Sequence, residues 1–175
     1  MSVLDRFRLD GKVAVITGAS SGLGAAFATG LAEAGADIAI CARRAEKLAD
    51  TKRAVEALGR RCVAVPADVA NPDDCNRVVA ETVEQLGKVD VLINNAGIGT
   101  AVPATREAPD EFRRVIDINL NGSYFMAQAC GRAMKDGGSI VNIGSVLGST
   151  TAFLPQAAYA SSTRPSSSSA RSTCW

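Results

Sequence analysis

The residues of this sequence best suited to chemistry form a glycine-rich loop near the N-terminus, Thr17-Gly18-x-x-x-Gly22-x-Gly24. A short apolar run, residues 13–16, precedes the loop, and a helical pattern follows it. A helix N-terminus offers unpaired N–H groups and the positive end of a dipole, and glycines let the backbone approach phosphates closely. This order predicts a site for a dinucleotide pyrophosphate. A plain turn is the alternative, because a glycine loop by itself is weak evidence.

Histidine is absent from the 175 residues, which limits the acid/base chemistry available to the chain. Proton transfer must use Tyr, Lys, Asp, Glu or Cys, and histidine-dependent triads are excluded. The cysteines are odd in number and show no C-x-x-C spacing, so we expect free thiols in a reducing cytoplasm and no metal site. They are Cys41, Cys62, Cys75, Cys130 and Cys174.

The composition is that of a globular protein, with 47% hydrophobic residues and a net formal charge of +1. This balance argues against a nucleic-acid or membrane-surface partner. No apolar run is long enough for a transmembrane helix, and the N-terminus lacks the apolar core of a signal peptide. We therefore expect a cytoplasmic protein.

Short apolar runs alternate with helical patterns over most of the chain, which is typical of a parallel sheet covered by helices on both faces. We predict an α/β fold, a Rossmann-type doubly wound sheet of about five strands. Ligands lie beyond the carboxyl ends of the strands in such a sheet, and a polar or glycine motif follows each predicted strand. The predicted strands are residues 13–16, 38–42, 62–66, 89–93 and 139–143.

Three predicted helices carry specific signals. The stretch Asn71-Pro72-Asp73-Asp74 predicts an N-cap, a proline in the first turn and acids at the positive end of the dipole. Leu23, Phe27 and Leu31 recur every fourth residue and predict the apolar face of the first helix. A long amphipathic helix is predicted over residues 111–134.

With the glycine loop, Asp68-Val69, Asn94-Asn95-Ala96-Gly97, Asn119, Ser145 and Tyr159 in this order, the chain resembles the short-chain dehydrogenase/reductase family. It is most similar to the 3-oxoacyl-carrier-protein reductase-like branch. The resemblance runs from Gly11 to about Ser162. We therefore predict a partial NAD(P)-binding domain over residues 1–162.

The resemblance implies a binding role for each matching motif. The glycine loop would hold the pyrophosphate, Asp68 and Val69 would lie against the adenine, and residues 95–97 would follow the adjacent ribose. Asn94 would fasten the sheet. The implied cofactor residues are Gly18, Ser20, Ser21, Gly22, Leu23, Gly24, Asp68, Val69, Asn95, Ala96 and Gly97.

The residues after the second predicted strand bear on the choice between the two nicotinamide cofactors. An acid there would accept from the ribose 2′-hydroxyl, whereas an arginine accommodates a 2′-phosphate. Here Ala42 stands where the acid is expected, and Arg43 follows it. A guanidinium suits a phosphate, so we add Arg43 to the cofactor residues and prefer NADP, with NAD possible. The alternative is that Arg43 and Arg44 are solvated charges.

The resemblance also implies hydride transfer between the cofactor and a small carbonyl/alcohol substrate. Tyr159 would exchange a proton with the substrate oxygen, and Ser145 would donate a hydrogen bond to the same oxygen. A free phenol has a pKa of about 10, so it needs a nearby cation at neutral pH. Asn119 would hold a water for proton relay; the alternative is an amide that kinks its helix.

The chain departs from the family after Tyr159. The family places a lysine four residues after the tyrosine, where this chain has Thr163, and Pro165 argues against a continuing helix. The family's following strands, helices and substrate loop have no counterpart, and residues 163–175 read as an aberrant, disordered tail. A frameshift would explain this: if Thr163-Arg164-Pro165 is encoded ACA-AGG-CCN, the shifted frame reads Lys-Ala.

Two interpretations follow from this departure. The first is an oxidoreductase of the 3-oxoacyl or another ketone reductase type, impaired at its end; the second is a catalytically dead NAD(P)-binding module or a frameshifted gene product. The intact family form would be a homo-oligomer. The fifth predicted strand would leave an open sheet edge, so we expect aggregation.

Overall fold

A parallel sheet of five strands in the order β3-β2-β1-β4-β5 forms the centre of the protein. The structure is a computed structural model, and it describes residues 3–99, 101–148 and 157–163. The predicted α/β fold is confirmed. The strands are β1 (Val13–Thr17), β2 (Asp37–Ala42), β3 (Cys62–Pro66), β4 (Val91–Asn94) and β5 (Ser139–Asn142).

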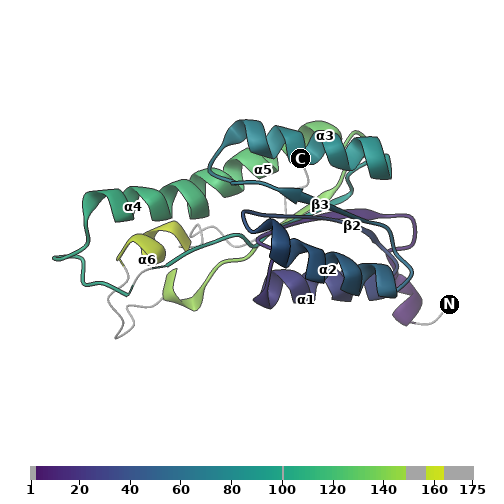
Figure 1. Cartoon of the computed structure of the whole chain (residues 1–175), viewed down its shortest axis with the longest axis horizontal. Helices are drawn as coiled ribbons and strands as arrows, with labels where there is room; N and C mark the ends of the chain where they lie inside the picture. Colours follow the sequence, from purple (N-terminus) through teal and green to yellow (C-terminus); the bar gives the residue numbers. More distant parts are fainter. Residues whose placement is uncertain (1–2, 100, 149–156, 164–175) are drawn as a thin grey trace.

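Helices cover both faces of the sheet (Figure 1). One face packs against α1 and α2, and the other packs against α3 and α5, which divides the buried apolar residues into two clusters. No helix in the described ranges is long and apolar enough to cross a membrane. The α-helices are α1 (Gly22–Glu33), α2 (Ala45–Ala57), α3 (Pro72–Leu86), α4 (Pro109–Ile116), α5 (Gly122–Ala133) and α6 (Ala157–Thr163).

The capping signal predicted at the start of α3 is confirmed. The Asn71 side chain accepts a hydrogen bond from the Asp73 N–H at 2.9 Å, and Pro72 follows in the first turn. The helix ends at Gly87, whose φ of 94° lies in the left-handed region that glycine tolerates best. Local sequence is therefore sufficient to set the limits of this helix.

The predicted apolar face of α1 is confirmed for Phe27 and Leu31, which are partly buried and pack against the core, and is wrong for Leu23, which is 64% exposed. The fully buried positions of the helix are Gly24, Ala28 and Ala32. A Cβ atom on Gly24 would lie 2.5 Å from the Gly18 carbonyl oxygen, so only a very small residue fits there. Small residues therefore occupy the positions of α1 that lie closest to the sheet and the glycine loop.

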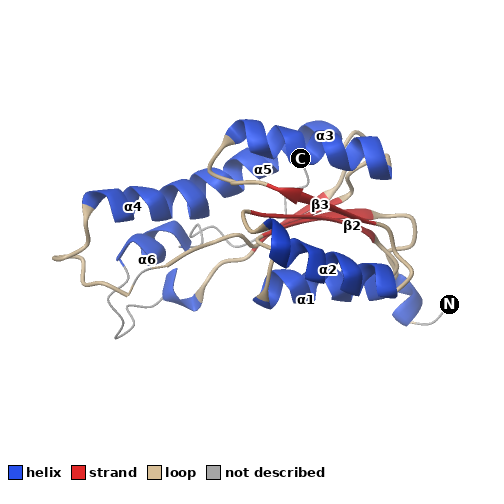
Figure 2. Ribbon diagram, viewed as in Figure 1, coloured by secondary structure: helices blue, strands red, loops and turns tan. Residues whose placement is uncertain are grey.

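The long helix predicted over residues 111–134 is a sequence of three segments. A π-helical stretch, η2 (Asp117–Asn121), joins α4 to α5 and contains Asn119. Such π-helical stretches are rare and frequently occur at functional sites. Figure 2 shows α4 extending away from the sheet, with the short helix α6 below it. A 3₁₀ turn, η3 (Val146–Gly148), follows β5, and another, η1 (Leu4–Phe7), precedes β1.

Candidate cofactor site and catalytic residues

A cavity of about 360 Å³ lies beyond the carboxyl ends of the strands. Every predicted cofactor residue lines it except Gly22, Leu23 and Gly24. Five further residues line the cavity that were not assigned to the cofactor from the sequence: Ala42, Arg44, Ala67, Ile98 and Ile118. The full lining comprises Gly18, Ser20, Ser21, Ala42, Arg43, Arg44, Ala67, Asp68, Val69, Asn95, Ala96, Gly97, Ile98 and Ile118.

The glycine loop is held close to the end of β4. Gly18 has a φ of +68°, and a Cβ atom there would lie 2.8 Å from the Ala96 Cα. The Thr17 hydroxyl oxygen accepts hydrogen bonds from the Asn95 and Ala96 N–H groups at 3.0 and 2.9 Å. The Asn95 amide in turn donates to the Thr17 carbonyl at 3.0 Å. These contacts fix the floor of the cavity.

The N-terminus of α1 fits an anionic group. Its N-cap residue, Ser21, makes no side-chain hydrogen bond to the first turn, in contrast to Asn71 at the start of α3. The first N–H groups of α1 therefore lack a side-chain cap, and a Cβ atom on Gly22 would meet open space. Arg44 donates to the Ser20 and Ser21 hydroxyls at 3.1 and 3.2 Å, which adds a positive charge beside the loop. Together these features suit a pyrophosphate.

The opposite part of the cavity is formed by Asp68, Val69 and Ile118. The Asp68 carboxylate accepts from the Ala70 N–H at 3.0 Å, so the turn after β3 is ordered by its own side chain. The Asp68 N–H donates to Asp74, and this bond together with Arg77 lowers the pKa of the Asp74 carboxyl. Ile118 was not singled out from the sequence, because only the fold brings it beside Asp68.

Asn119 joins its helix to the loop that follows β4. Its side-chain oxygen accepts from the Ile98 N–H, and its amide donates to the Ile98 carbonyl, both at 2.9 Å. The same amide donates to the Ser162 hydroxyl of α6 at 3.1 Å. Asn119 thus lies in a π-helical stretch, and its side chain joins η2 to the loop after β4 and to α6.

Tyr159 lies on α6 and packs against the loop after β4. A Cβ atom on Gly99 would lie 3.1 Å from the Tyr159 ring, which shows that the ring packs closely against this part of the loop. The Thr163 hydroxyl donates back to the Tyr159 carbonyl at 2.9 Å, inside the helix. Thr163 supplies no charge at this position. The rest of the predicted tail, residues 164–175, lies outside the described residues, as does Cys174.

Ser145 lies between β5 and η3, where its hydroxyl oxygen accepts from the Leu147 N–H at 3.2 Å. The segment is near α6, because a Cβ atom on Gly144 would lie 3.6 Å from the Thr163 carbonyl oxygen. The fold therefore gathers the elements that carry Asn119, Ser145 and Tyr159. None of these three residues lines the cavity of the cofactor residues.

The amide of Asn94 fastens the sheet, as expected. It donates to the Ser123 carbonyl of α5 and to the Asn142 side chain of β5, both at 2.9 Å. Asn142 is the residue paired with Asn94 in the register of the two strands. This contact holds β5 to the sheet next to the segment that carries Ser145.

The four described cysteines are buried, free thiols. Burial raises the pKa of Cys41 to about 12 and that of Cys75 to about 11, so neither is a thiolate at neutral pH. A thiolate is the reactive form of cysteine, and these residues are therefore core residues. Within the described ranges, no three His, Cys, Asp or Glu side chains form a cluster that could hold a metal ion.

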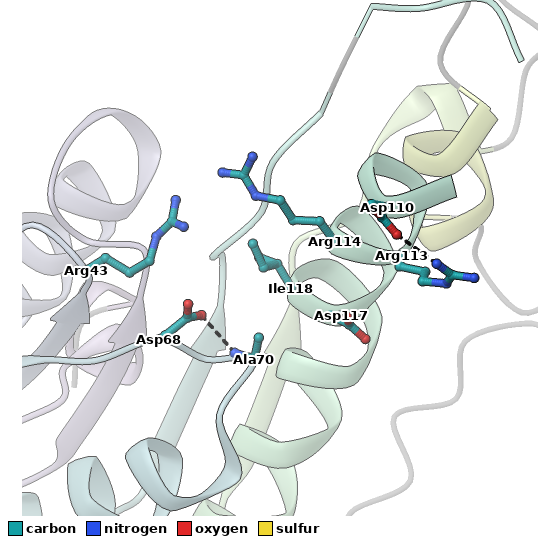
Figure 3. Close-up of a pocket in the computed structure, with 8 residues that line it drawn as sticks. All are labelled: Arg43, Asp68, Ala70, Asp110, Arg113, Arg114, Asp117 and Ile118. Atoms are coloured by element: carbon teal, nitrogen blue, oxygen red, sulfur yellow. Dashed lines mark hydrogen bonds and ion pairs between the residues drawn. The ribbon is translucent and has the colours of Figure 1, made fainter. Parts of the chain in front are cut away.

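A second cavity, of about 240 Å³, adjoins the first and shares Arg43, Asp68 and Ile118 with it. Figure 3 shows Arg43 and Arg114 pointing toward the same space from opposite sides. Arg113 and Asp110 lie on the other side of α4 in the same view. The remaining lining residues are Ala70 and Asp117.

Comparison with known proteins shows similarity over most of the chain. The family model described as short chain dehydrogenase matches residues 12–164. L-rhamnose 1-dehydrogenase (NAD(P)(+)) of Sphingomonas sp. strain SKA58 is 43% identical over 142 residues, which are 79% of this chain and 56% of that protein. The chain spans about half to two thirds of the length of the curated relatives it matches.

Solved structures show the same fold. A short-chain type dehydrogenase/reductase from Mycobacterium marinum matches with a TM-score of 0.90 and 35% identity, covering 93% of this chain and 68% of that one. A gluconate 5-dehydrogenase from Burkholderia cenocepacia J2315, in complex with NADP and tartrate, matches with a TM-score of 0.85 and 38% identity. That match covers 93% of this chain and 64% of the dehydrogenase.

Proposed function

The chain belongs to the short-chain dehydrogenase/reductase family of oxidoreductases, and we propose that it binds NADP(H) in the 360 Å³ cavity. The observation that carries this proposal is the uncapped N-terminus of α1 beside the glycine loop. Arg44 beside Ser20 and Ser21 supports an anionic ligand there. Arg43, which is exposed at the end of β2, supports the phosphorylated cofactor over NAD.

We propose further that the substrate is a small carbonyl/alcohol pair. When bound, the cofactor supplies or receives the hydride. Tyr159 would exchange the proton with the substrate oxygen, and Ser145 would hold that oxygen by a hydrogen bond. Asn119 would position the loop after β4 through its two bonds to Ile98.

The substrate is not assigned to 3-oxoacyl groups. The relatives similar to this chain include an L-rhamnose dehydrogenase, versicolorin reductases and a 2-dehydro-3-deoxy-D-gluconate 5-dehydrogenase, by their names. These names support a polar ketone or secondary alcohol in general, and the 3-oxoacyl branch stays a prediction.

A second candidate function is cofactor binding without turnover, and Thr163 favours it. Its hydroxyl is bonded to the Tyr159 carbonyl, and threonine brings no positive charge that would stabilise a phenolate. On this candidate the cofactor residues are functional and Tyr159 is not. The two candidates share the same binding site and differ only in turnover.

Oxidation of NADPH against a panel of ketones and keto-sugar acids separates the candidates, because the absorbance of the reduced nicotinamide reports turnover directly. The first candidate predicts slow turnover that Tyr159→Phe abolishes and Thr163→Lys raises about tenfold or more. The second predicts saturable NADPH binding with no turnover in any variant. Absence of NADPH binding would contradict both.

We also propose that the family's homo-oligomer uses the outer face of α4, η2 and α5. Phe112, Leu120 and Tyr124 are large apolar side chains that recur along this face and are exposed. Their spacing makes a stripe on one side of a helix. Sedimentation velocity tests this: Leu120→Glu is expected to reduce the assembled fraction, and an unchanged profile would contradict the proposal.

A further inference from the structure

The adjoining 240 Å³ cavity offers two arginines that other parts of the chain do not hold firmly. Arg43 makes no hydrogen bond or ion pair with any other described residue. Arg114 has only a long contact with Glu111 among the described residues, 3.9 Å between Nη1 and Oε1, and both side chains are half exposed. Such exposed ion pairs contribute little to stability, so this contact does not fix the Arg114 side chain. Both guanidinium groups are therefore free to bind a ligand.

The neighbouring charges are already committed elsewhere. Arg113 pairs with Asp110 at 2.7 Å on the other side of α4. Asp117 accepts from the Asn121 amide at 2.9 Å, and Asp68 accepts from the Ala70 N–H at 3.0 Å. The lining as a whole is balanced in formal charge, but Arg43 and Arg114 are the two guanidinium groups that point into the same space without a close partner among the described residues.

The position of Arg114 relates it to the cofactor cavity. Arg114 precedes Ile118 by four residues, and residues four apart lie on the same face of a helix. Ile118 lines both cavities, so the face of α4 that carries Arg114 continues directly into the site beside Asp68. Arg43 approaches the same point from the end of β2 (Figure 3).

We propose that Arg114 is a second residue that selects the phosphorylated cofactor, binding the ribose 2′-phosphate from α4 while Arg43 binds it from the end of β2. Planar guanidinium groups match phosphate oxygens in pairs, so two of them suit one phosphate well. The inference rests on the proposed function, in which the adenosine end lies beside Asp68 and Ile118. Selection of NADP is then shared between two elements far apart in the sequence.

Calorimetric titration of NADPH and NADH into the wild-type chain and its variants tests the inference through binding alone. Arg114→Gln is expected to weaken NADPH binding about tenfold and to leave NADH binding unchanged, because charge-assisted hydrogen bonds to one phosphate are lost. Arg132→Gln is the matched control: it removes the same charge from an exposed position of α5 that lines neither cavity, and it should change neither affinity. Glutamine has nearly the helix propensity of arginine, so both variants keep their helices.

Further comparisons separate failure of the inference from failure of the proposed function. If Arg43→Gln weakens NADPH binding and Arg114→Gln does not, the role of Arg114 is overturned and the cofactor preference stands. If the wild-type chain binds NADPH and NADH equally, the preference and the inference both fall. If neither nucleotide binds, the proposed function itself falls. A loss of 2′,5′-ADP affinity without a loss of 5′-AMP affinity in Arg114→Gln would support the inference independently.

Discussion

The central strand β1 and the edge strand β5 differ in how completely their residues are buried. All five residues of β1, which leads into the glycine loop, are buried, whereas three of the four residues of β5 are exposed. Most cofactor residues follow β1, β2 and β4, which are paired on both sides, whereas Asp68 and Val69 follow β3, the other edge strand. Ser145 and Tyr159 follow or lie beside an edge strand whose outer side has no partner in the described part of the chain. We therefore expect the binding half, which comprises β1 to β4 and α1 to α3, to be rigid. The catalytic end, which comprises β5, η3 and α6, is held by fewer contacts.

Truncation of a buried residue in β1 should reveal this difference most strongly. Ile16→Ala removes a fully buried side chain and is expected to lower the free energy of unfolding by about 3 kcal/mol. Val141→Ala in β5, where the side chain is 43% exposed, should cost less than about 1 kcal/mol. Urea unfolding measures both. Equal losses would mean that another surface covers β5 in solution, which would break the comparison.

The close approach at the glycine loop gives the next largest effect. Gly24→Ala places a Cβ atom 2.6 Å from the Asn95 amide nitrogen and 2.5 Å from the Gly18 oxygen, and should cost about 2–3 kcal/mol. Gly30→Ala, in the same helix, meets nothing within 4 Å and should stabilise the protein by up to about 1 kcal/mol. Thermal unfolding of the pair checks this, and similar melting temperatures would contradict the tight packing.

An ion pair at the start of β2 makes the binding half sensitive to acid. Burial alone would raise the pKa of Asp37, but hydrogen bonds from Arg61 and the charges of Arg60 and Arg61 lower it. Its stabilisation is therefore complete above the ordinary carboxyl pKa of about 4 and is lost as the pH falls through the lowered folded value.

Asp37→Asn tests this dependence. The variant should be less stable than the wild-type chain by about 1 kcal/mol at neutral pH. The difference should shrink at acid pH, where the wild-type carboxylate becomes protonated. Unfolding free energies measured across the pH range give the comparison. A difference that is constant with pH would show that the ion pair does not stabilise the fold.

The smallest effect concerns two helix N-termini within the binding half. Asn71→Ala removes the cap of α3 and should cost about 1 kcal/mol of stability. Ser21→Ala at the start of α1 removes no cap bond and should leave stability nearly unchanged. Chemical denaturation compares the two variants. A large loss in Ser21→Ala would mean that α1 is capped by its own serine and is not kept open for a ligand.

Local sequence predicted the features that depend on neighbours in the chain. The positions of the five strands and the Asn71 cap follow from signals within a few residues. The face of α1 was predicted wrongly only at Leu23, because the close approach of Gly24 to Gly18 depends on the fold and gives no local signal. Ile118 and Arg114 could not be identified from the sequence, because their relation to Asp68 and Arg43 arises only when α4 folds over the end of the sheet.

An NMR titration of NADPH into the ¹⁵N-labelled chain tests the central claim most directly, since it needs neither turnover nor a mutation. The account predicts saturable shifts of the amide signals of Gly18–Gly24, of Asp68 and Val69, and of Asn95–Gly97. Shifts confined to other residues, or no shifts at all, would contradict the assignment of the cavity beside the glycine loop as the cofactor site.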